Sequence, residues 1–75
     1  MTSEERKYIN HIFRTGYEMI EKHYGANTKE AFGAFHDDAG ERVKLSGNDP
    51  LLAAMFVHVV FPVISRSYRE EVGLL

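Results

Sequence analysis

Between Leu51 and Ile64 the chain is apolar at twelve of fourteen positions, and only His58 and Pro62 interrupt the run. An amphipathic surface helix shows polar residues along one face, whereas this segment has no polar face. A helix that is apolar all round has to be covered on every side. Because a chain of 75 residues has little other protein for that purpose, the pattern predicts that a second copy or a partner completes the cover.

The N-terminal third carries apolar residues at steps of three and four, which predicts a helix over 3–24. Thr2 and Glu5 have the spacing of a capping box, in which each side chain satisfies a free backbone amide of the other residue. Gly25 follows the last apolar residue as a C-terminal stop. The apolar stripe consists of Tyr8, Ile9, Ile12, Phe13, Gly16, Tyr17, Met19, Ile20 and Tyr24.

The next segment fits two structures. Asn27 as N-cap and Glu30 three residues later predict the start of a second helix, which we expect to continue to about residue 36. Beyond it, apolar and polar residues also alternate around a turn at Gly40, which predicts a hairpin at about 34–46. The positions that keep helical spacing are Phe32, Phe35, Ala39 and Val43.

The apolar run begins at a helix-start signal. In Asn48-Asp49-Pro50 a capping side chain precedes a proline at the first helical position, where the missing amide has no cost. Several later residues are β-branched and suit a strand, but the length of the run and its cap favour a helix. Pro62 cannot donate an amide to the carbonyl of His58, so the sequence predicts a kink at this point.

These segments predict one small all-α domain over residues 1–75, with three helices and the third kinked near Pro62. The second half of the third helix is expected at 63–72, ending at Gly73. The alternative is an α+β domain, in which the hairpin at about 34–46 lies beside the apolar segment. The aromatic residues expected in the core are Phe13, Tyr17, Phe32, Phe35, Phe56 and Phe61.

Composition limits how so small a domain is stabilised and what it binds. The absence of cysteine excludes disulfides and thiolate metal sites, which leaves a good core and self-association as the main stabilising devices. Nine basic and eleven acidic residues are mixed along the chain, which argues against binding to a nucleic-acid backbone. The N-terminus lacks the layout of a secretory signal, and the apolar run is shorter than the ~20 residues of a membrane span. We therefore expect a soluble cytoplasmic protein.

The surplus apolar surface predicts a homo-oligomer, in its simplest form a dimer. We expect the contact to involve the outer face of the apolar run. Because every face of this run is apolar, the pattern alone does not decide which one points inward. The interface residues assigned on this basis are Leu52, Met55, Phe56, Val59, Val60 and Val63.

One cluster has the residue types of an anion site. Arg66 and Arg69 flank Tyr68, and two guanidiniums beside an aromatic ring can hold a phosphate and stack a base. Arg14 and Tyr17 form a similar pair in the first helix. The alternative, which we favour, is that the two C-terminal arginines belong to the solvated face of a helix and complement its dipole.

Histidine supplies the remaining candidate ligands. His58 is the only ionisable group in the apolar run, and it fits either a ligand pocket or a hydrogen-bonded position in the core, the second being favoured. His36, Asp37 and Asp38 are three potential metal ligands in a row. Four histidines in the chain show no metal-binding spacing, so we expect a solvated turn at 36–38, no bound metal and no cofactor.

Three functions are compatible with these patterns. The leading one is a non-enzymatic interaction protein that binds another macromolecule as a homo-oligomer, as small accessory and inhibitor proteins do, including those of phages. The second is an oligomeric binder of a small anionic ligand such as a nucleotide, through Arg14, His58, Arg66, Tyr68 and Arg69. The third is a metal-dependent enzyme or sensor built on His36, Asp37, Asp38 and His58. Nucleophile-elbow and phosphate-loop motifs are absent, so no catalytic residue is assigned.

Overall fold

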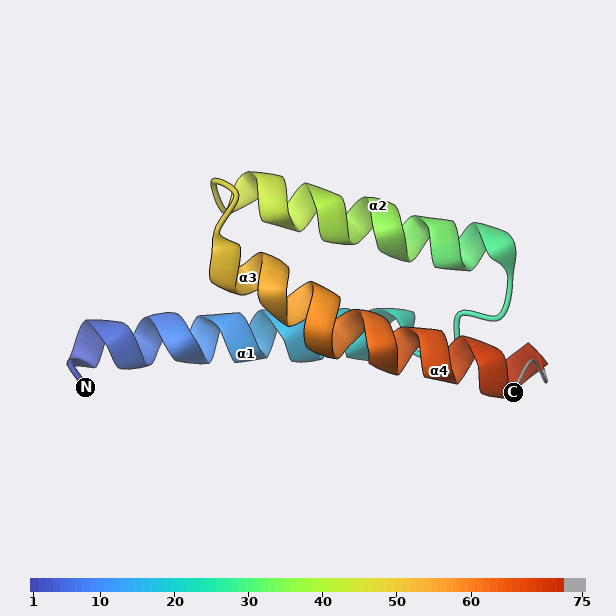
Figure 1. Ribbon diagram of the computed structural model, residues 1–75, viewed down its shortest axis with the longest axis horizontal. Helices are drawn as coiled ribbons and strands as arrows, with labels where there is room; N and C mark the ends of the chain where they lie inside the picture. The colour runs from blue at the N-terminus through green and yellow to red at the C-terminus, as the bar shows by residue number, and fades with distance from the viewer. Residues whose placement is uncertain (73–75) are drawn as a thin grey trace.

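The computed structural model describes the backbone of residues 1–72 and the side chains of residues 1–68, and every regular element in this part is helical (Figure 1). The all-α prediction is therefore confirmed, and the alternative hairpin at about 34–46 is wrong. Gly73, the expected end of the third helix, lies outside the described residues. The elements are α1 (Ser3–His23), α2 (Lys29–Leu45), α3 (Pro50–Met55), η1 (Phe56–Val60) and α4 (Phe61–Val72). Segments α3, η1 and α4 follow one another without a break, and we call them the long arm.

Helix α1 begins at the predicted capping box. The hydroxyl of Thr2 accepts the amide of Glu5 at 3.1 Å, and the Glu5 carboxylate accepts the amide of Thr2 at 2.8 Å. The start of α2 lies one residue later than predicted. Thr28, not Asn27, has the extended backbone of an N-cap, and its hydroxyl accepts the amide of Ala31 at 3.0 Å.

The turn between α2 and α3 is tight. Gly47 and Asn48 both adopt positive φ, at 76° and 61°, a conformation that glycine and asparagine accept most readily. The turn places Asp49 at the N-cap of α3, where its carboxylate accepts a hydrogen bond from the amide of Leu51 at 2.8 Å. Pro50 occupies the first turn of α3, as the sequence predicts.

The long arm leaves α-helical geometry just before Pro62. Residues Phe56–Val60 form a π turn, in which the amide of Phe61 bonds to the carbonyl of Phe56, five residues back. Proline cannot donate to the carbonyl four residues before it, and its ring collides with that carbonyl in an α-helix. A wider turn before Pro62 relieves this conflict, so the irregularity expected near Pro62 takes the form of a π turn.

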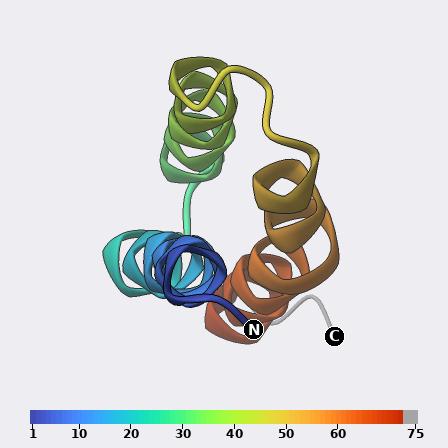
Figure 2. The same cartoon turned by 90° about the vertical axis from the view of Figure 1, so that its left-hand side faces the viewer.

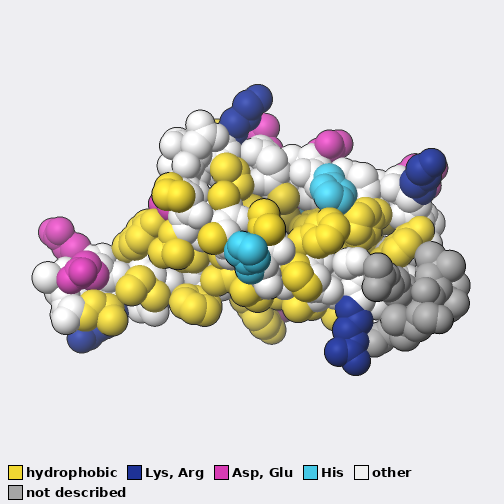
Figure 3. Space-filling model, viewed as in Figure 1, with side chains coloured by type: hydrophobic (Ala, Val, Ile, Leu, Met, Phe, Trp, Pro, Cys, Tyr) yellow, Lys and Arg dark blue, Asp and Glu magenta, His cyan; other side chains and the backbone are white. Residues whose placement is uncertain are grey.

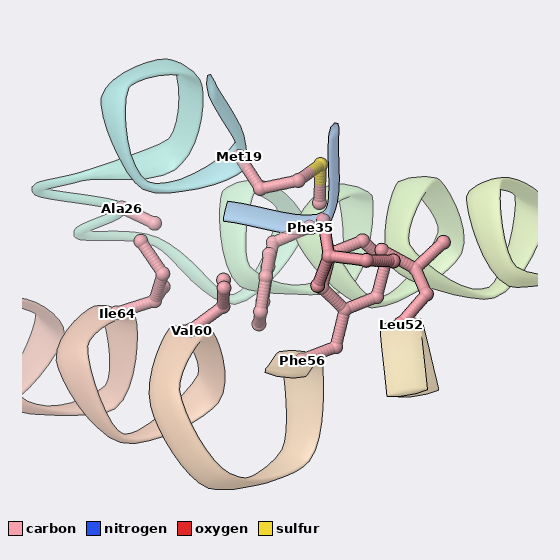
Figure 4. Close-up of a cluster of buried hydrophobic side chains, with 8 residues drawn as sticks. Met19, Ala26, Phe35, Leu52, Phe56, Val60 and Ile64 are labelled. Atoms are coloured by element: carbon pink, nitrogen blue, oxygen red, sulfur yellow. The ribbon is translucent and has the colours of Figure 1, made fainter. Parts of the chain in front are cut away.

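Helices α1 and α2 and the long arm form a three-sided arrangement, in which the sides are not equally close to one another (Figure 2). Helix α1 packs closely against α2 and against all three segments of the long arm. Helix α2 and the long arm stand farther apart and are bridged mainly by aromatic rings. The buried hydrophobic side chains lie between these elements (Figure 4). They are Ile12, Met19, Ala26, Phe35, Leu52, Phe56, Val60 and Ile64.

Two polar contacts connect the ends of the helices. The hydroxyl of Tyr8 in α1 donates to the Asp49 carboxylate, 2.7 Å from Oδ2, and so ties α1 to the start of the long arm. The amide of Gly25 donates to the hydroxyl of Ser67 at 3.0 Å, and that hydroxyl donates to the carbonyl of Ile64 at 2.8 Å. Ser67 is buried, so this pair of bonds holds the α1–α2 connection against α4.

Only part of the predicted aromatic core is buried. Phe35 and Phe56 are buried and Phe32 is half-buried. Three rings assigned to the core are instead exposed, namely Phe13, Tyr17 and Phe61. The core closes around the opposite flank of α1, where Ile12, Gly16 and Met19 face the other helices.

Two glycines inside α2 give a first testable prediction. A Cβ atom built on Gly33 or Gly40 meets no atom within 4 Å, and neither residue has positive φ. Alanine at either position should therefore raise the free energy of unfolding by up to about 1 kcal/mol, measured by urea denaturation. Gly47→Ala is the control, because its φ of +76° strains any side chain and should lower stability. A loss of stability in Gly40→Ala would contradict the helix at 37–45, and a loss in Gly33→Ala would contradict its first half.

Candidate functional site

The long arm exposes apolar side chains on its outer side. Leu51, Val57, Val59 and Phe61 are 45%, 61%, 46% and 38% exposed, and no charged residue occurs over 50–65. Figure 3 shows a broad hydrophobic area over this arm, with the charged groups placed around it. We call these four residues, together with the exposed His58, the outer face. Contiguous apolar surface of this kind is typical of interaction sites.

The structure corrects the interface assigned from the sequence. Leu52, Phe56 and Val60 are buried inside the subunit, so they cannot form an outer contact. They recur at steps of four and point into the core with Ile64. The other assigned residues, Met55, Val59 and Val63, are half-buried or exposed. The sequence could not distinguish these faces because all of them are apolar.

The long arm is also longer than its apolar run. Pro50–Tyr68 is a helix of 19 residues that by length and composition is able to cross a membrane, and 28% of its most apolar stretch is buried inside the domain. The prediction that this segment is too short for a span considered only residues 51–64. The core helix of a soluble protein meets the same two criteria, so this property alone does not assign the helix to a membrane.

An apolar pocket of about 330 Å³ lies between α2 and the long arm. Its volume falls in the range of small-molecule sites. The pocket exists because α2 and the long arm are held apart by large rings rather than packed backbone to backbone. Its walls are Phe35, His36, Ala39, Phe56, Val57 and Phe61.

A cluster of aromatic rings forms one side of this pocket and fixes its walls. Phe61 of α4 lies 5.4 Å from the ring of His36 and 6.0 Å from that of Phe32, both in edge-to-face geometry. The rings of Phe35 and Phe61 are stacked at 6.4 Å. Phe32 also contacts the ring of Tyr68 at 5.3 Å. Edge-to-face pairs are favourable beyond the area they bury, so these rings hold one another in place.

The π turn lies between two of the rings that line the pocket, Phe56 and Phe61. Residues five apart lie about 140° apart around an α-helix of 3.6 residues per turn. The bond from the Phe61 amide to the Phe56 carbonyl widens the turn between them. Phe56 is buried and Phe61 is 38% exposed, and both line the pocket. Irregular turns of this type are frequent at functional sites.

The five predicted anion-binding residues do not gather at one described pocket. Arg14 lies on the exposed side of α1, in a shallow depression that it shares with Lys7, Asn10 and His11. Arg66 is exposed on α4, and Tyr68 is half-buried in the aromatic cluster. The side chain of Arg69 lies outside the described residues. The nucleotide site thus gains no support from the arrangement of Arg14, Arg66 and Tyr68.

The histidine assignments need two corrections. His58 is exposed on the outer face, so the favoured interpretation as a core histidine is wrong. Residues 36–38 lie within α2 and do not form a solvated turn. Among the described residues no group of three or more His, Cys, Asp or Glu side chains is placed to hold a metal ion.

Asp38 instead joins α2 to α1. Its carboxylate lies 2.8 Å from Nε2 of His23, 3.0 Å from Nζ of Lys22 and 3.5 Å from Nε of Arg42. The hydrogen bond with His23, and the interactions with Lys22 and Arg42, lower the pKa of Asp38 from 3.8 to about 2. Lys22 and His23 lie on α1, so the cluster ties the second half of α2 to the neighbouring helix.

This lowered pKa predicts acid sensitivity. Folded protein binds the Asp38 proton less readily than unfolded protein, so the stabilisation is present above pH 3.8 and disappears as the pH falls towards about 2. The loss is at most about 2 kcal/mol, reduced by solvent screening. Urea denaturation between about pH 5 and pH 2.5 should show a weaker pH dependence in Asp38→Asn than in wild type. Identical dependences would contradict the ion-pair cluster.

The long arm thus carries two candidate binding sites, which share Val57 and Phe61. The outer face is apolar and exposed, which suits a macromolecular surface. The pocket between α2 and the long arm is concave and aromatic, which suits a compact ligand. Comparisons with known protein families, with curated proteins and with solved structures give no match to this chain.

Proposed function

We propose that this chain is a non-enzymatic interaction protein that pairs with a second copy of itself through the outer face of the long arm. The observation that supports this proposal is the exposure of Leu51, Val57, Val59 and Phe61 on a helix without a charged residue over 50–65. Such a surface costs free energy in water at roughly 25 cal/mol per Å², and burying it in a dimer recovers that energy.

A second copy of the chain is well suited to bury this face. In a two-fold dimer the same patch meets itself, so an uncharged apolar patch needs no complementary charge on its partner. His58 lies between Val57 and Val59, where it can supply a polar contact within an otherwise apolar interface. The rest of the surface carries mixed charges of both signs, which keep the resulting dimer soluble.

A second exposed stripe is available for a further protein partner. Phe13, Tyr17 and Tyr24 are 64%, 64% and 60% exposed, and their spacing of four and seven residues places them on one side of α1. Tyrosine is enriched among the residues that dominate binding energy at protein interfaces. The proposed function is therefore that of a small accessory or inhibitor protein whose dimer presents two such stripes.

The proposal predicts that Val59→Asp dissociates the dimer. Val59 is 46% exposed and does not line the pocket, so a charge there should disrupt the contact without unfolding the subunit. Light scattering across a dilution series should give half of the wild-type molar mass, with an unchanged helical circular dichroism spectrum. Leu45→Asp is the matched control, since Leu45 is 78% exposed on α2, away from the outer face.

Three results would overturn the proposal. The first is wild-type protein that stays monomeric at millimolar concentration, because the outer face is then not covered by a second copy. A Val59→Asp variant that keeps the wild-type mass places the contact elsewhere. Monomeric wild-type protein that floats with neutral lipid vesicles, where Val59→Asp does not, assigns the face and the helix Pro50–Tyr68 to a membrane.

A further inference from the structure

We infer that the pocket between α2 and the long arm binds a free, uncharged molecule with a single aromatic ring system and one hydrogen-bonding group. This inference is distinct from the self-association proposed above, although Val57 and Phe61 line the pocket and also belong to the outer face. It rests on the volume of the pocket and the chemistry of its walls.

The walls favour an aromatic ligand over an aliphatic one. Phe35, Phe56 and Phe61 contribute rings on the two sides of a space of about 330 Å³. A ring inserted among rings gains edge-to-face and offset contacts beyond its apolar burial. Val57 and Ala39 are the aliphatic part of the lining, and the short side chain of Ala39 leaves room on the α2 side.

The polarity of the walls excludes a charged ligand. Lys, Arg, Asp and Glu are absent from the residues that line this pocket, so an ion would lose its hydration there without gaining a partner. His36 is the one lining residue with a polar side chain. Its ring is held against Phe32 at 5.1 Å and Phe61 at 5.4 Å. An imidazole in this position can form a hydrogen bond with one hydroxyl or ring N–H of a ligand.

The irregular turn lies along one wall of the pocket. Phe56, the first residue of the π turn, and Phe61, the residue that follows it, both line the space, as does Val57 within the turn. The amide of Phe61 bonds to the carbonyl of Phe56, five residues back, so the backbone between the two rings is wider than an α-helical turn. This wall of the pocket is therefore supplied by the irregular segment of the long arm.

The test uses phenol and indole as probes on the full chain. Both should raise the melting temperature in a saturable manner, because a ligand that binds only the folded state stabilises it. Cyclohexanol, which has the hydroxyl and the ring size of phenol without its aromaticity, should bind about 2- to 10-fold more weakly. Benzoate, which is charged, should bind more weakly still. Equal binding of phenol and cyclohexanol, or no binding of phenol and indole at millimolar concentration, would overturn the inference.

Two variants locate the site. Ala39→Leu should fill the pocket and abolish phenol binding, whereas Ala34→Leu makes the same change at an exposed position of α2 and should leave it unchanged. Should Ala39→Leu fail to fold, Phe61→Leu removes one aromatic wall while keeping its apolar character, and it should abolish the preference for phenol over cyclohexanol. If the folded variants of Ala39 and Phe61 bind phenol as tightly as wild type does, the ligand lies elsewhere and the inference is overturned.

The same measurements on Val59→Asp separate this inference from the proposed dimer. Phenol binding by both wild type and Val59→Asp supports a ligand site whatever the oligomeric state proves to be. Binding by Val59→Asp alone would mean that a side chain of a second copy occupies the pocket in wild type, and the inference would then be wrong. A monomeric wild type that binds phenol overturns the dimer and leaves the pocket supported.

Discussion

Replacing Phe35 with alanine should lower the free energy of unfolding by about 3–5 kcal/mol, the usual cost of removing a buried phenylalanine. Phe35 is only 1% exposed, and its ring lies 5.5 Å from His23 of α1 and 6.4 Å from Phe61 of α4. Its ring therefore packs α2 against both α1 and the long arm. A domain of this size is stable by only about 5–10 kcal/mol, so urea denaturation should place the variant close to unfolding at room temperature.

Phe13→Ala is the matched control for this experiment. It is the same chemical change, made at a ring that is 64% exposed on α1. Its effect on stability should stay within about 0.5 kcal/mol. Similar losses from the two substitutions would contradict the assignment of the core, because the sequence alone places both rings there.

The starts of α1 and α3 could be predicted from the sequence because their signals are local. Thr2 with Glu5, and Asp49 with Pro50, satisfy backbone amides within one turn, and no distant residue is needed. The second half of α2 has no such signal. Its path depends on contacts of Asp38 with Lys22 and His23, which lie more than a dozen residues away in the sequence. The sequence of this segment therefore fits a hairpin and a helix equally well.

The candidate sites were less predictable for two physical reasons. Where every face of a helix is apolar, periodicity carries no information, and only the packing against α1 selects Leu52, Phe56 and Val60 for the core. The pocket depends on a distance between α2 and the long arm that no sequence pattern encodes. Pro62 was the available signal. It indicated a kink, but it did not indicate that the irregularity is a π turn or that Phe56 and Phe61 both line a pocket.

The second large effect is expected at Gly16, where α1 meets the long arm. A Cβ atom built there would lie 2.9 Å from both Cγ and Sδ of Met55 and 3.5 Å from a methyl of Val60. Gly16→Leu should therefore separate these helices and lower the free energy of unfolding by about 1–3 kcal/mol, despite the better helix propensity of leucine. Urea denaturation, read by circular dichroism, measures this loss.

Met55→Ala tests whether the loss arises from this contact. Met55 is the flexible side chain that stands where the new leucine would go, so removing it should make room. The double variant Gly16→Leu/Met55→Ala should be more stable than the sum of the two single effects predicts, with a coupling of more than about 0.5 kcal/mol. Strict additivity would mean that α1 and the long arm do not meet at Gly16. The outer face would then have to be assigned anew, because it is defined by which side of the long arm this contact covers.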